Sequence, residues 1–178
     1  MYEVLEYEST LELKDARGKR ATFKKREKVR YLQDNIIAYQ DQAWGDGQIL
    51  IDYRCSPGVA VDFHRPSRQT YILIALRDVK QHGDTDEINI QWGIKNGFLR
   101  DQEAWETQVS HPTQRLKVQV IFPKSRPPVQ VVIIEDTSRR SQILEENAQR
   151  KLPDGRWIVV WETYKPRLNE RYILKWEW

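Results

Sequence analysis

Apolar and polar residues alternate with a period of two along most of the chain. Residues 48–54 and 114–122 place large apolar side chains on one face and chiefly polar side chains on the other, and alternate residues of 157–161 and 172–178 likewise place large apolar side chains on one face. This alternation is typical of strands that bury one face. Turn residues such as those at 45–47 separate the segments. The pattern predicts about ten to twelve short strands. In the first segment, the shared apolar face is formed by Ile49, Ile51 and Tyr53.

Two further segments are apolar on both faces, and one segment is the best helical candidate. Residues 71–76 and 129–134 carry almost continuous apolar side chains. Such runs are typical of central strands that are covered on both sides. Residues 141–151 contain three apolar residues at a weakly helical spacing. We therefore expect at most one short helix.

The predicted fold class is all-β, as an antiparallel β-sandwich that could be immunoglobulin-like in its C-terminal half. A closed β-barrel is the alternative. Residues 1–178 are expected to form a single continuous β-unit, because each half alone would bury only a small core. The alternative division falls at residues 93–101. It gives an N-terminal β-subdomain over 1–98 and a small immunoglobulin-like β-sandwich over 103–178.

The first two predicted strands can be aligned residue by residue. Their large apolar residues lie at odd positions, so the numbers of two facing residues must sum to an even number. We place a three-residue loop at 16–18, with Gly18 in the left-handed conformation. Residues 15 and 19 then face each other, so the numbers of every facing pair sum to 15 + 19 = 34. The facing pairs are then Leu11 with Phe23, Leu5 with Val29, Glu8 with Arg26, and Glu6 with Lys28.

Composition narrows the class of protein. Charged residues make up 31% of the 178 residues, but seven Trp and the ordered apolar runs are typical of a folded domain. The single cysteine, Cys55, excludes an internal disulfide and a multi-cysteine zinc site. The sequence has neither a transmembrane run of eighteen apolar residues nor a basic and then apolar leader. We therefore expect a reducing, cytoplasmic location.

Strand-like patterns extend to both ends of the sequence. Tyr2 already belongs to the first alternating segment, and residues 176–178 belong to the last. Free-standing proteins usually have polar, frayed ends. This pattern predicts that the chain is a module of a larger protein.

Basic residues gather between Lys14 and Arg30. Nine Lys and Arg against two acidic residues give this segment 9 − 2 = +7, so the rest of the chain totals 3 − 7 = −4. The segment could hold nucleic-acid phosphates, an acidic protein or anionic lipid. It could equally be a solvated face that Glu6 and Glu8 neutralise. Alternation places five cations on one outward face: Arg20, Lys24, Arg26, Lys28 and Arg30.

Aromatic residues suggest one further contact. Trp44 lies in a predicted loop and is a candidate anchor at an interface. The remaining strand tryptophans are expected to pack in the core, because they lie at alternate positions on one face of their strands. They include Trp157, Trp161, Trp176 and Trp178.

Sequence motifs give little support to catalysis or to a metal site. Cys55 and His64 are close in sequence, but a nucleophile pair needs hydrogen-bond contact and an activated thiolate. Residues 82–86 contain metal-compatible side chains at a spacing that fits neither a calcium loop nor a two-histidine zinc site. Glycine-rich phosphate loops and nucleophile elbows are absent from the sequence. We expect no catalytic residue, no metal and no cofactor.

These observations predict a non-catalytic recognition or regulatory β-module of a larger intracellular protein. It would dock a protein partner, or other domains of the same polypeptide, through the cationic hairpin face and Trp44. Nucleic-acid binding through the same cationic hairpin face is the alternative. A second alternative is small-ligand binding inside a closed barrel. An enzyme would need carboxylates or histidines brought together from distant positions.

Overall fold

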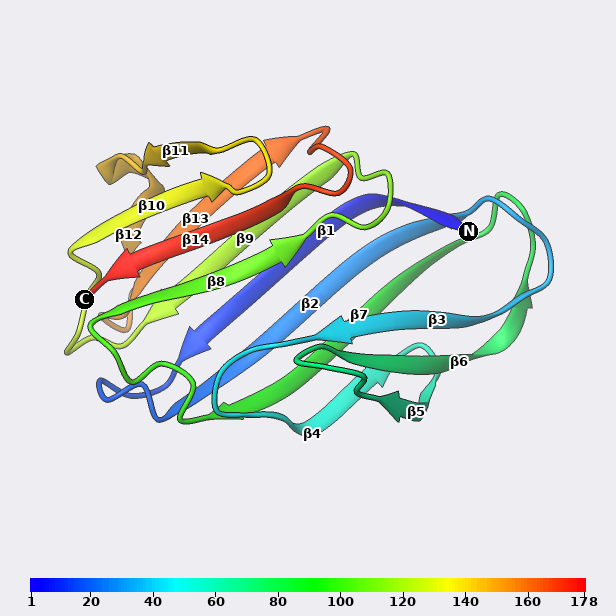
Figure 1. Ribbon diagram of the computed structural model, residues 1–178, viewed down its shortest axis with the longest axis horizontal. Helices are drawn as coiled ribbons and strands as arrows, with labels where there is room; N and C mark the ends of the chain where they lie inside the picture. Colours follow the sequence, from blue (N-terminus) through cyan, green and yellow to red (C-terminus); the bar gives the residue numbers. More distant parts are fainter.

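The computed structural model describes residues 1–178, except for the side chain of Glu146. Its strands form two layers (Figure 1). One layer is a seven-stranded sheet in the order β12-β13-β9-β1-β2-β7-β4. Two smaller sheets lie over it, one in the order β11-β10-β14-β8 and the other in the order β3-β6-β5. The predicted antiparallel β-sandwich is therefore confirmed.

The seven-stranded sheet consists of β1 (Tyr2–Leu13), β2 (Arg20–Tyr31), β4 (Gln48–Ser56), β7 (Thr85–Lys95), β9 (Arg115–Phe122), β12 (Gln149–Lys151) and β13 (Trp157–Tyr164). The four-stranded sheet consists of β8 (Gln102–Gln108), β10 (Gln130–Glu135), β11 (Arg140–Ile143) and β14 (Arg171–Glu177). The three-stranded sheet consists of β3 (Ile36–Ala43), β5 (Val59–His64) and β6 (Thr70–Lys80). These fourteen strands exceed the ten to twelve predicted.

The helical candidate at residues 141–151 is mostly wrong. This region forms the short strands β11 and β12 on either side of a single 3-10 turn, η1 (Glu146–Ala148). Three apolar residues cannot build a buried helical face. Residues 140–143 instead pair with β10, which supplies their backbone hydrogen bonds.

The predicted register of β1 and β2 is confirmed from Glu6 onward. Leu11 faces Phe23, and Gly18 has the expected left-handed φ of 65°. The pair of Leu5 with Val29 is wrong, because a bulge between Val4 and Glu6 shifts the register by one residue. Val4 therefore faces Val29. The confirmed outer pairs are Glu8 with Arg26 and Glu6 with Lys28.

Strand β4 departs from the regular alternation that the sequence predicts. Two register shifts interrupt its pairing with β7, and Leu50 and Asp52 have positive φ. As a result, Leu50 packs against the core, while Ile51 pairs with Gly93. The prediction that Ile49, Ile51 and Tyr53 share one face is therefore wrong.

Aromatic rings join the two layers. Phe23 of β2 lies 5.1 Å from Trp92 of β7 and 4.8 Å from Trp105 of β8, between ring centroids. Phe98 lies 5.9 Å from Trp176 of β14 in the same way. All five rings are at most 8% exposed. Large aromatic side chains dominate core energetics, so this cluster is a main source of stability.

The two runs that are apolar on both faces occupy central strands, as predicted, but the outer face of the first run is open. Residues 71–76 lie in β6, between β3 and β5. Residues 130–134 lie in β10, between β11 and β14. Leu73 is nevertheless 41% exposed and Val129, just before β10, is 76% exposed. The prediction of cover on two sides is therefore wrong for residues 71–76, whereas Val132 and Ile134 on the outer face of β10 are half-buried.

Both halves of the sequence contribute strands to both layers (Figure 1). Parallel pairing of β1 with β9, from Tyr7 with Leu116 to Glu12 with Ile121, joins the halves in the large sheet. The number of folding units stays a prediction, as does the immunoglobulin-like arrangement of residues 103–178. Each of the three sheets ends in edge strands, so the fold is an open sandwich and not the closed barrel.

Gly18 offers a test of this packing. A Cβ atom there would lie 1.5 Å from the backbone oxygen of Phe98, whereas one at Gly83 would meet nothing within 4 Å. Both glycines have positive φ. We expect Gly18→Ala to cost at least about 2 kcal/mol of unfolding free energy, and Gly83→Ala about 1 kcal/mol. Urea denaturation measures both, and equal losses would contradict the close approach of Gly18 to Phe98.

Candidate docking surfaces

The predicted cationic face lies on the outer side of the seven-stranded sheet. Its residues belong to β2, which pairs with β1 on one side and β7 on the other. The Arg26 guanidinium contacts Glu6 at 2.9 Å, Glu8 at 3.4 Å and Glu87 at 3.1 Å. Arg26, the central residue of the cationic face, is therefore neutralised by carboxylates from both neighbouring strands.

This ion-pair network continues across the sheet. Arg115 of β9 lies 2.8 Å from Glu162 of β13 and 3.7 Å from Glu6 of β1. Lys117 lies 3.1 Å from Glu8. The hydrogen bond from Arg115 lowers the pKa of Glu162 to about 2, so this carboxylate is charged at neutral pH. Five neighbouring strands, from β13 to β7, thus share one balanced network.

The other predicted cations differ in their compensation. Arg20 lies 3.7 Å from Asp15, and Arg30 lies 3.3 Å from Glu3. Lys24 and Lys28 are exposed and have no ion pair within 4 Å among the described residues. Only part of the predicted cationic charge is therefore uncompensated.

Trp44 does not lie with the cationic face. It follows β3, in the layer of small sheets, and is half-buried. It lines a small cavity of about 70 Å³ with Tyr2, Thr107 and His111. A cavity of this size has room for water but not for a drug-sized ligand. A partner that contacts both the ribbon and Trp44 would have to reach from one layer to the other.

Cys55 and His64 occupy different sheets. Cys55 lies in β4 and is half-buried, with its thiol 3.9 Å from the carbonyl oxygen of Gly58. Burial raises the pKa of this thiol, which opposes thiolate formation. His64 lies in β5, in the three-stranded sheet. Across the part of the chain that is described, three metal-ligating side chains are nowhere grouped closely enough to hold an ion.

The outer surface of the three-stranded sheet, which we call the small-sheet face, exposes apolar side chains among polar ones. Leu73 at its centre is 41% exposed, and Val59 on the edge strand is 62% exposed. Phe63, also on β5, does not belong to this face, because it pairs with the buried Ile72 and its ring lies 5.6 Å from that of Tyr53. Polar residues surround Leu73, because it pairs with Gln40 on one side and Asp62 on the other. A depression of about 370 Å³ is lined by Gln40, Asp62, His64, Tyr71 and Leu73.

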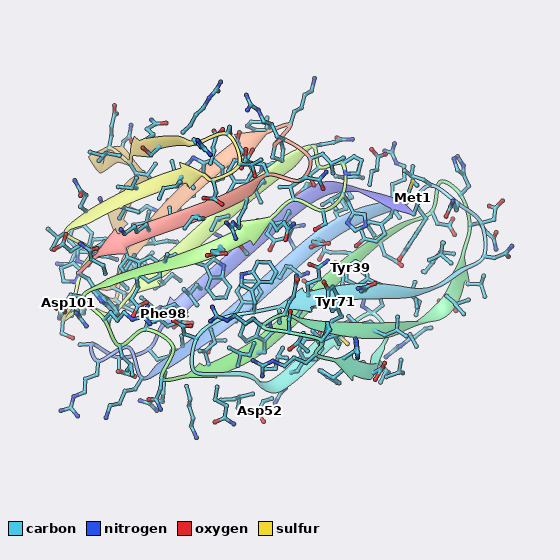
Figure 2. The ribbon with its side chains drawn as sticks, in the orientation of Figure 1. Met1, Tyr39, Asp52, Tyr71, Phe98 and Asp101 are labelled. Atoms are coloured by element: carbon cyan, nitrogen blue, oxygen red, sulfur yellow. The ribbon has the colours of Figure 1, made fainter. Side chains whose placement is uncertain are left out.

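A buried ion cluster connects the inner side of the three-stranded sheet to the large sheet. Lys25 of β2 lies 2.5 Å from Asp41 of β3 and 3.1 Å from Glu27. The Tyr39 hydroxyl donates to Glu27 at 2.6 Å, and the Tyr53 hydroxyl donates to Asp41 at 2.9 Å. Tyr39 is one of the side chains labelled in Figure 2. The cluster thus holds β3 against two strands of the large sheet, β2 and β4.

Electrostatic attraction keeps the buried Lys25 protonated. Burial alone would lower the pKa of Lys25, but attraction by Asp41 and then by Glu27 outweighs it and raises that pKa well above its usual value. Lys25 and Glu27 belong to the segment between Lys14 and Arg30 in which basic residues gather. The overlooked signal is their odd numbering, which places them on the buried face with Phe23 and Val29.

Comparisons with known proteins identify the fold. A scan of family models and a search of curated proteins found no match. Solved structures do match: a provisionally assigned protease from Parabacteroides distasonis has a TM-score of 0.61 at 12% identity, over 99% of this chain and 40% of its own. An M1 zinc metallopeptidase from Deinococcus radiodurans has a TM-score of 0.53 at 9% identity, over 97% of this chain and 42% of its own.

The fold defined here is therefore a β-domain that peptidase-like proteins also contain. The chain spans about two fifths of the length of these solved proteins. Identities this low show a shared fold and carry no activity with them. A search of the described residues for a helix that could cross a bilayer found none.

The buried cluster yields a stability prediction. Lys25→Met leaves Asp41 and Glu27 buried without their cation, so we expect a loss of about 3–5 kcal/mol in urea denaturation. Lys117→Met removes a partly exposed ion pair and should cost at most about 1 kcal/mol.

The triple variant Lys25→Met, Glu27→Gln and Asp41→Asn should recover part of the loss, because no charge is then left unpaired. Equal losses from Lys25→Met and Lys117→Met would contradict the role of the buried cluster.

Proposed function

We propose that the chain is a non-catalytic accessory β-domain that docks onto another domain of a larger polypeptide through its small-sheet face. The observation that carries this proposal is the contrast between two outer surfaces. The seven-stranded sheet presents a balanced ion-pair network, which is stable in water. The small-sheet face presents Leu73 and Val59 to solvent, with polar residues at its rim.

An apolar centre with a polar rim is the usual anatomy of a protein interface. Exposed apolar patches on soluble domains commonly mark contact sites. The rigid backing that such a contact needs is present, because Ile72 and Ile74 on the opposite side of β6 are fully buried. The small-sheet face therefore suits a stable domain contact.

The structural neighbours support this proposal at the level of fold. In both, about three fifths of the chain lies outside the region that matches. A β-domain of this kind thus occurs beside other structure in those proteins. By analogy, we propose that the small-sheet face contacts a neighbouring domain of the same polypeptide.

Electrostatic docking through the cationic face is the second candidate. The specific observation in its favour is that Lys24 and Lys28 are exposed without an ion pair among the described residues. These two cations could contact an acidic partner or a nucleic acid. Because three carboxylates neutralise Arg26, the cationic face carries less free positive charge than the sequence predicts.

Docking can be tested in the native polypeptide. Leu73→Lys puts a charge at the centre of the proposed contact and should weaken docking about tenfold or more. Released domains should increase the radius of gyration in small-angle X-ray scattering. Thr22→Lys, on the outer face of the large sheet, is the matched control and should leave the radius unchanged.

An unchanged radius for Leu73→Lys, in a variant that remains folded by circular dichroism, would refute docking through this face. A native gene product limited to these 178 residues would refute the accessory role.

The nucleic-acid alternative has its own test. We expect fluorescence anisotropy with labelled duplex DNA, single-stranded DNA and RNA to show no binding at physiological salt, because the ion-pair network already neutralises most of the ribbon. The control changes Arg20, Lys24 and Arg30 to Glu. Tight binding that falls steeply with salt and is lost in this control would move nucleic acid to first place.

A further inference from the structure

We propose that the outer face of the seven-stranded sheet carries a phosphate-binding site centred on Lys24 and Arg54. These residues belong to one row across four strands. Arg54 of β4 pairs with Gln91 of β7, Gln91 pairs with Lys24 of β2, and Lys24 pairs with Thr10 of β1. The row holds two cations and no carboxylate.

The neighbouring row shows the contrast. It places Ser56, Asn89, Arg26 and Glu8 side by side on the same four strands. Arg26 is compensated there by three carboxylates. Charge balance thus holds in one row and fails in the next. An unbalanced pair of cations attracts an anion from solution.

The two rows line a depression of about 430 Å³. Lys24 and Arg54 are exposed there, and neither has an ion pair within 4 Å in the part of the chain that the structure describes. Glu8 is the one carboxylate of the lining, and it is already engaged by Lys117 at 3.1 Å and Gln119 at 2.9 Å. The depression therefore combines free positive charge with room for a ligand.

The backbone of β4 is distorted next to this depression. Register shifts fall on both sides of Ile51, and the second one comes just before Arg54. Leu50 and Asp52 have φ of 62° and 52°, a conformation that is costly for leucine and better tolerated by aspartate. Bulges commonly re-aim a side chain at a site. Here the shifts return Arg54 to the outer face, beside Gln91.

The donor set fits a phosphate group. Lys24 and Arg54 lie two strands apart, about 10 Å between backbones, and their long side chains can converge over Gln91. Guanidinium binds phosphate with two parallel hydrogen bonds, and ammonium adds a point charge. The side-chain amide of Gln91 and the hydroxyl of Ser56 supply neutral donors, whereas the Asn89 amide already donates to Glu87. Several donors around one anion suit the oxygens of a phosphate better than a single carboxylate.

The test is a nuclear magnetic resonance titration of the chain with inorganic phosphate and, separately, with glycerol 3-phosphate. The signals followed are the Gln91 side-chain amide and the Arg54 Nε–H. We expect saturable shifts with a dissociation constant on the order of 1–10 mM. Acetate should shift the same signals less.

Substitution localises the site. Lys24→Gln and Arg54→Gln should each weaken binding about five- to tenfold. Lys28→Gln is the matched control, because Lys28 lies on the same strand and face as Lys24. It is about 13 Å from Lys24, which is longer than the Debye length, so salt screens its charge from the site. It should change affinity less than twofold.

Three results would overturn the proposal. The first is the absence of a saturable shift with either phosphate, and the second is equal weakening by Lys24→Gln and Lys28→Gln. The third is binding of a short DNA duplex, lost in the Lys24 and Arg54 variants, while both small phosphates fail to bind. That result would make the row a nucleic-acid contact instead. None of these outcomes depends on docking of the small-sheet face.

Discussion

The buried attraction between Lys25 and the carboxylates of Asp41 and Glu27 is the interaction on which the arrangement of the layers depends. Three charges sit inside the sandwich, and each is at most 8% exposed. A buried charge without a partner is strongly destabilising, so β3 cannot move away from β2 without exposing or separating these groups. The hydroxyls of Tyr39 and Tyr53 complete the cluster. The small sheet is thereby fixed in position over the large one.

That fixed position gives the molecule two different outer surfaces. On the large sheet, acidic and basic residues of five strands compensate each other, whereas Lys28 and the row of Lys24 and Arg54 stay without an ion pair among the described residues. On the three-stranded sheet, Leu73 and Val59 remain in solvent. A balanced charged face is soluble without a partner, whereas an apolar face is stabilised by contact. The proposed docking and the proposed phosphate site thus lie on opposite layers.

Much of the fold could be predicted from the sequence, because strand alternation is a local signal. The register of β1 and β2 followed from odd-numbered apolar residues and one glycine turn. The errors at Leu5 and at Ile51 have a common cause: bulges add a residue, and alternation carries no marker for them. Compensation of Arg26 by Glu87, 61 residues away, depends on which strands become neighbours. Lys25 was visible as a charge on an apolar face, but Asp41 as its partner was not.

Hydroxyl-radical footprinting tests the central claim, that the small-sheet face is a covered contact surface, most directly. The isolated chain and the native polypeptide would be oxidised in parallel, and the modification of Tyr71 and Leu73 compared with that of Ile121 on the outer face of the large sheet. The account predicts strong protection of Tyr71 and Leu73 in the native polypeptide and unchanged oxidation of Ile121. Equal oxidation of Tyr71 and Leu73 in both samples would contradict it.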